Sequence, residues 1–85
     1  MEIRLSRDAE KFLRRVDSKT RQRLIAGITG LTQKPPKGDI KPLSGYTDGR
    51  FRLRVGGYRV IYKIINDTIE ILYVIDIGVR GDIYK

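Results

Sequence analysis

Basic side chains recur at alternate positions around a pair of glycines. They are Arg50, Arg52, Arg54, Arg59 and Lys63, on either side of Gly56-Gly57. Alternate residues of a strand share one face, so a hairpin turning at the glycines gathers these side chains on one surface. No acidic residue occurs between Arg50 and Asn66. Guanidinium groups bind phosphate through paired hydrogen bonds, so the pattern predicts a nucleic-acid phosphate site, with a merely solvated face as the alternative.

This surface has some of the groups needed to cleave RNA by attack of a 2′-OH on the adjacent phosphorus. Fixed guanidinium groups stabilise the negative charge that develops on the phosphorane. Two more candidates follow the last predicted strand, Arg80 and Tyr84, because Gly78 and Gly81 allow the backbone to turn back toward the basic surface. Taken alone, a tyrosine at position 84 is more often a packing residue than a catalytic one.

The residue types that are missing exclude several other chemistries. The 85 residues include no His and no Cys, which excludes a Ser-His-Asp triad, a cysteine nucleophile and a zinc finger. We expect no metal and no cofactor. The net charge of +8 favours a polyanionic partner. No apolar run is long enough to span a membrane, and the first residues lack the apolar stretch of a signal peptide, which predicts a cytoplasmic protein.

The elements that must position these residues follow from periodicity. Residues 2–5 alternate as a short strand, and Ser6 is a predicted N-cap for a helix that buries Ala9, Phe12, Leu13 and Val16. Asp17 or Ser18 caps a second helix with an apolar face of Leu24, Ile25, Ile28 and Leu31. A loop covers about residues 33–49, and strands follow at 51–55, 58–65 and 69–77. The length allows one domain, residues 1–85.

We therefore predict an α+β fold of order β-α-α-β-β-β, an antiparallel four-stranded sheet with an N-terminal helical hairpin on one face. Turns at Gly56-Gly57 and Asn66-Asp67 place Arg54 opposite Arg59 and Lys63 opposite Glu70. The predicted helix-side face comprises Phe51, Leu53, Val55, Tyr58, Val60, Tyr62, Ile64, Ile69, Ile71, Tyr73 and Ile75. The predicted open face carries the basic residues together with Ile61, Leu72 and Val74.

Two segments resemble the RelE/ParE superfamily of type II toxin-antitoxin toxins, most closely its RelE branch. They are residues 49–62 (GRFRLRVGGYRVIY) and 75–84 (IDIGVRGDIY), and the resemblance extends over essentially the whole chain. It implies an mRNA interferase, a ribosome-dependent and metal-independent endoribonuclease that cleaves mRNA in the ribosomal A site. Its implied partners are the ribosome, mRNA and a cognate antitoxin whose acidic, amphipathic segment covers the open face. The toxin itself is implied to be monomeric, forming oligomers only through the antitoxin.

The resemblance also implies roles for individual residues. It makes Arg52, Arg59, Arg80 and Tyr84 catalytic, and Arg50, Arg54 and Lys63 substrate-binding. This chain departs from the family pattern in having Arg at 50 and 52, where relatives commonly have Lys, and Val79, where many have His. Two alternatives stay open: a ParE-like, non-catalytic inhibitor of DNA gyrase, and a plain nucleic-acid-binding module.

Overall fold

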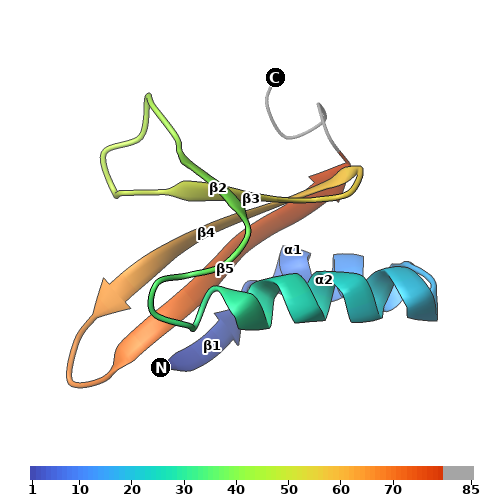
Figure 1. The fold of residues 1–85 in the computed structure, drawn as a ribbon, viewed down its shortest axis with the longest axis horizontal. Helices are drawn as coiled ribbons and strands as arrows, with labels where there is room; N and C mark the ends of the chain where they lie inside the picture. Colours follow the sequence, from blue (N-terminus) through green and yellow to red (C-terminus); the bar gives the residue numbers. More distant parts are fainter. Residues whose placement is uncertain (80–85) are drawn as a thin grey trace.

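The computed structural model describes residues 1–79. Arg80 and Tyr84 lie outside the described residues. The elements are β1 (Glu2–Leu5), α1 (Arg7–Arg15), α2 (Ser18–Gly30), β2 (Asp39–Pro42), β3 (Phe51–Val55), β4 (Tyr58–Asn66) and β5 (Glu70–Val79). The two helices form one layer against a single sheet, as Figure 1 shows. The predicted α+β class and helical hairpin are confirmed.

The sheet differs from the prediction in strand number and direction. It has five strands in the order β1-β5-β4-β3-β2, and β1 runs parallel to β5. The prediction of four antiparallel strands was therefore wrong. Strand β2 was missed because Asp39–Pro42 lies in a segment rich in proline and glycine and has only Ile40 as an apolar signal. Its strand conformation depends on pairing with Phe51–Arg54, which is distant in sequence.

Helix α1 begins where the sequence predicts. The Ser6 hydroxyl accepts a hydrogen bond from the Ala9 N–H at 3.0 Å and donates one to the Ile75 carbonyl at 2.6 Å. The first bond is a standard N-cap, which satisfies one free N–H of the first turn. The second bond attaches the start of the helix to β5. Ala9 and Leu13 then lie buried against the sheet.

Helix α2 is capped by Asp17, whose carboxylate accepts from the Thr20 N–H at 3.3 Å. Its Gly27 lies so close to β3 that an added Cβ would approach Val55 Cγ2 to 2.8 Å, so close packing explains this glycine. The predicted burial of Ile25 was wrong, since 47% of this residue is exposed. The buried face of α2 consists of Leu24 and Ile28.

Arg21 connects the two helices. Its Nε donates to the Leu13 carbonyl at 2.7 Å, and one Nη donates to the Val16 carbonyl at 2.9 Å. These bonds satisfy carbonyls at the end of α1 that have no partner within the helix. A basic residue of the hairpin thus has a structural role.

The predicted register is right for one hairpin of the sheet and wrong for the other. The β3–β4 register is confirmed, with Arg54 opposite Arg59 and Val55 opposite Tyr58. The β4–β5 register was wrong, because Lys63 pairs with Tyr73, three residues beyond Glu70. The strands are joined across residues 67–69 and not by a two-residue turn at Asn66-Asp67. A register displaced by an odd number of residues turns each side chain of the strand to the opposite face of the sheet.

The helix-side core therefore uses different β5 residues from those predicted. Leu72, Val74 and Ile77 belong to it, whereas Ile69 is 49% exposed. A β-bulge makes the spacing possible: Tyr62 pairs with Val74 and Ile61 with Asp76, leaving Ile75 as an extra residue. The predicted core positions Ile69, Ile71, Tyr73 and Ile75 are absent from this cluster.

Candidate functional site

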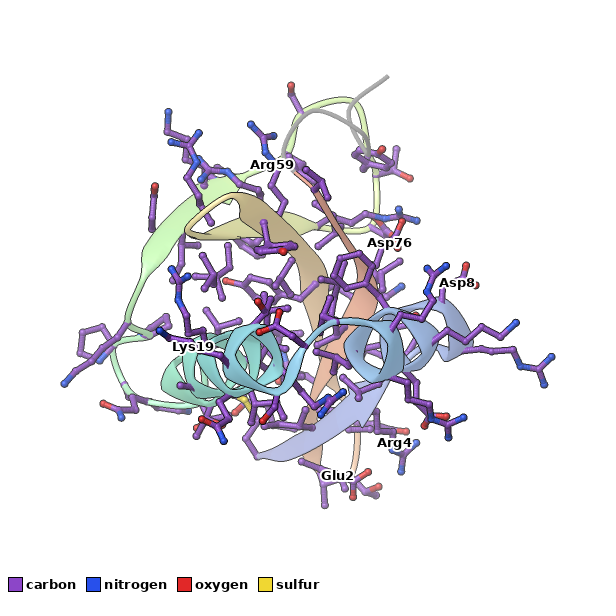
Figure 2. All side chains as sticks on the ribbon, turned by 90° about the vertical axis from the view of Figure 1, so that its right-hand side faces the viewer. Glu2, Arg4, Asp8, Lys19, Arg59 and Asp76 are labelled. Carbon is purple, nitrogen blue, oxygen red and sulfur yellow. The ribbon has the colours of Figure 1, made fainter. Side chains whose placement is uncertain are left out.

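The face of β3 and β4 turned away from the helices carries the basic side chains that the sequence groups together. We call Arg50, Arg52, Arg54, Arg59 and Lys63 the basic face. Arg54 lies directly opposite Arg59 in the β3–β4 register. In Figure 2, Arg59 projects away from the two helices. The predicted convergence of positive charge on one side of this hairpin is therefore present.

Asp39 of β2 brings a carboxylate onto the basic face. It lies opposite Arg54 in the β2–β3 register. Its two carboxylate oxygens lie 3.4 Å from Arg52 Nη1 and 3.8 Å from Arg54 Nη1. One carboxylate thus interacts with two neighbouring guanidinium groups and offsets part of their mutual repulsion.

Arg52 is enclosed within this arrangement. Only 5% of its side chain is exposed, and its Nη1 also donates to the Asp39 backbone carbonyl at 3.4 Å. Arg54 is more open, with 32% of its side chain exposed. Its Nε is buried and has no hydrogen-bond partner among residues 1–79. Of these two arginines, Arg54 is the one that a ligand can reach.

A second carboxylate, from the β2–β3 loop, binds the other basic residues. Arg50 Nε donates to both oxygens of Asp48, at 3.0 and 3.1 Å, and Lys63 Nζ lies 3.4 Å from one of them. Hydrogen bonding from Arg50, together with the nearby Lys63, lowers the pKa of the Asp48 carboxyl from its ordinary value of 3.8. Asp48 is therefore ionised at neutral pH.

The apolar patch predicted between the charges is not there. Leu72 and Val74 are fully buried on the helix side, and Ile61 is 6% exposed. The prediction that these three residues form an apolar contact surface for a partner on the basic face is therefore wrong. The cause is the β4–β5 register, which turns Leu72 and Val74 to the other face.

Sequence reasoning missed both aspartates of the site. Asp39 is identifiable only if β2 is recognised as a strand, because alternation then places it across from Arg54. Asp48, two residues before Arg50, carried the weaker signal of a local ion pair. Within residues 1–79, no three His, Cys, Asp or Glu side chains are placed to share a metal ion. No described helix has the length and apolar character needed to cross a membrane.

The fold and its basic hairpin define a small α+β domain of the RelE/ParE superfamily of toxins, as comparisons with known proteins show. Residues 3–84 match the family model described as ParE toxin of type II toxin-antitoxin system, parDE. The chain therefore belongs to this toxin family. A search of curated protein sequences found no match.

Three solved RelE structures have a similar fold. RelE in the archaeal RelE-RelB complex from Pyrococcus horikoshii OT3 is 25% identical, with a TM-score of 0.75 over 95% of this chain and 96% of that one. The RelB-RelE complex from Methanococcus jannaschii gives 25% identity and a TM-score of 0.69, covering 94% and 93% of the two chains. The isolated E. coli RelE toxin gives 27% identity and a TM-score of 0.70, covering 98% and 89%.

Proposed function

We propose that this toxin is a ribosome-dependent endoribonuclease that cleaves mRNA in the ribosomal A site. The observation that carries the proposal is the cross-strand pair of Arg54 and Arg59, with Arg50 and Lys63 on the same face. The likeness to solved RelE toxins at 25 to 27% identity supports the RelE-like activity.

In the proposed reaction, the 2′-oxygen attacks the adjacent phosphorus and the bond from phosphorus to the 5′-oxygen breaks. A 2′,3′-cyclic phosphate and a 5′-hydroxyl end result. Arg59 stabilises the charge on the phosphorane oxygens, an effect worth several kcal/mol in a preorganised site. Arg50, Arg54 and Lys63 bind the flanking phosphates.

The proton transfers are assigned from the resemblance to RelE toxins. Tyr84 positions or activates the 2′-OH, and Arg80 stabilises the phosphorane or protonates the leaving oxygen. Both groups have pKa values far from neutrality in water, so the RNA must be held in the reactive geometry. A ribosome that bends the mRNA provides this orientation, which explains why cleavage would depend on it.

For Arg52 we propose a positioning role in place of direct contact with RNA. Only 5% of its side chain is exposed, and its guanidinium holds Asp39 against β3. A side chain so enclosed acts on the substrate through the placement of β2 and of the neighbouring Arg54.

A cognate antitoxin is the proposed partner of the chain. The family is that of a type II toxin-antitoxin system, and RelE from two archaea was solved with RelB. The net charge of +8 favours a partner that is acidic where it covers the basic face. We propose that the toxin alone is monomeric and that larger assemblies form through the antitoxin.

A second candidate function is gyrase inhibition without catalysis, which the ParE description of the matching family favours. One fold serves both activities, so the fold does not decide between them. Supercoiling by purified gyrase, measured with the toxin present, separates the two. Complete inhibition of supercoiling with translated mRNA left intact would establish the gyrase function instead.

The nuclease proposal is tested by Arg59→Ala in a primer-extension assay of mRNA on translating ribosomes. Loss of phosphorane stabilisation should slow cleavage by about 10²-fold or more. Arg14→Ala is the matched control, because Arg14 lies on α1 in an exposed ion pair with Glu10. Cleavage at the normal rate by Arg59→Ala, or intact mRNA with the unmodified protein, would refute the proposal.

A further inference from the structure

An exposed aromatic side chain lies at the rim of the basic face. Tyr46 is in the β2–β3 loop and is 49% exposed. The guanidinium carbon of Arg50 lies 4.5 Å from the centre of its ring. Figure 1 shows this loop projecting from the sheet on the side away from the helices. The exposed ring thus neighbours the basic side chains that we propose bind phosphate.

The loop that carries Tyr46 is attached to the sheet at both ends. The Leu43 N–H donates to the Arg50 carbonyl at 2.9 Å, which closes the loop. Asp48 then connects it to Arg50 and, at 3.4 Å, to Lys63 of β4. Gly45 and Gly49 have φ of +86° and +72°, values that L side chains rarely adopt. The ring is therefore held in place beside the basic face.

The Tyr46 side chain combines a contact to a cation with exposed surface. The Arg50 guanidinium lies over the ring in a cation–π contact. Nearly half of the residue nevertheless stays exposed. Proteins that bind single-stranded nucleic acids combine such aromatic surfaces with basic groups that follow the backbone. An exposed tyrosine joined to an arginine has both components.

We propose that Tyr46 stacks on a nucleobase of single-stranded RNA while Arg50 and Lys63 bind the adjoining phosphates. This inference rests on the proposed RNA-binding function of the basic face and adds a base contact to it. The base stacks on the ring surface that Arg50 leaves open. Because every nucleobase has a π-face, the contact favours a nucleotide with a base over an abasic one and accepts any of the four bases.

The test uses two oligomers that the protein cannot cleave, because both lack the 2′-OH. One is hexadeoxyadenylate, and the other is a hexamer of abasic deoxyribose phosphates with the same charge. The unmodified protein should bind hexadeoxyadenylate at least about fivefold more tightly. Tyr46→Leu should lose this preference and bind both oligomers as the unmodified protein binds the abasic one. Tyr46→Phe, which keeps the ring, should retain the preference.

Two further variants sharpen the result. Ile69→Ala is the control, because Ile69 is also 49% exposed but lies at the β4–β5 connection, and the base preference should stay unchanged. The chain has no Trp, so Tyr46→Trp introduces a single tryptophan, whose emission can be excited apart from the tyrosines, at the proposed contact. Its emission should be quenched by hexadeoxyadenylate and unaffected by the abasic hexamer.

The outcomes distinguish the stacking proposal from the RNA-binding function on which it rests. An unchanged base preference in Tyr46→Leu, or Trp emission that hexadeoxyadenylate does not alter, would overturn the stacking proposal while phosphate binding stands. Failure of the unmodified protein to bind either oligomer at low salt would overturn the RNA-binding function together with the stacking. Loss of antitoxin binding in Tyr46→Leu, with the base preference retained, would assign the ring to a protein contact and also overturn the proposal.

Discussion

At Arg52 the guanidinium is held inside the sheet edge between the main chain and the carboxylate of Asp39. Arg50, two residues earlier on the same face, has 29% of its side chain exposed. The same residue type therefore serves two purposes at positions only two residues apart. Burial of the aliphatic part of an arginine stabilises the fold as an apolar side chain does, independently of its charge.

We predict that Arg52→Ala lowers the free energy of unfolding by about 2–4 kcal/mol, because it removes a large buried side chain. Arg50→Ala should change it by about 0.5 kcal/mol or less, as for most surface substitutions. Urea unfolding measures both. Equal effects of the two substitutions would contradict the positioning role that we assign to Arg52.

At the scale of the elements, the N-cap of helix α2 is a titratable residue, Asp17. The Asp17 carboxylate accepts from Thr20, and this hydrogen bonding lowers the pKa of Asp17 from its ordinary value of 3.8. A carboxyl whose pKa is lower in the folded state than in the unfolded state stabilises the fold. This contribution is fully present at pH values above the pKa of the unfolded state. The contribution is lost as the pH falls through the pKa of the folded state.

We predict that Asp17→Asn weakens the dependence of stability on pH below about 3.8, since the amide still caps the helix but does not titrate. Near pH 7 the two proteins should be similar in stability. Urea unfolding from pH 2 to pH 7 tests this. Asp67→Asn, at an exposed position in the β4–β5 connection, is the control. Identical pH profiles for Asp17→Asn and the unmodified protein would contradict the capping account.

For the whole molecule, the net charge of +8 includes basic residues that are already paired within the fold. Asp39 and Asp48 neutralise part of the basic face, and the helical hairpin uses Arg21 to hold its own carbonyls. The charges available to a polyanion are therefore fewer than the composition suggests. We assign phosphate contacts to Arg50, Arg54, Arg59 and Lys63.

Four such contacts predict that affinity for a single-stranded oligonucleotide falls with roughly the third power of salt concentration. Lys63→Ala should reduce the slope by about 0.7. Lys11→Ala, an exposed substitution on α1, should leave it unchanged. Binding titrations at several salt concentrations provide the slopes. A slope near zero, or equal changes in the two variants, would contradict the assignment of contacts to the basic face.

The features predictable from sequence are those governed by residues close together in the chain. The cap at Ser6, the buried positions Ala9 and Leu13, and the Arg54–Arg59 register across a two-residue turn all belong here. Each depends on local periodicity or turn chemistry. The helical hairpin and the alternation that gathers the basic face follow from the same patterns.

Tertiary structure alone decided how distant segments pair. The parallel alignment of β1 with β5, the pairing of β2 with β3 and the bulge at Ile75 are choices among registers with similar local preferences. Packing against the helices selects the register that buries Leu72 and Val74. The same long-range pairing brings Asp39 to Arg52 and Arg54. The arginines of the site were therefore evident in the sequence, whereas Asp39, the carboxylate shared by two of them, required the assembled sheet.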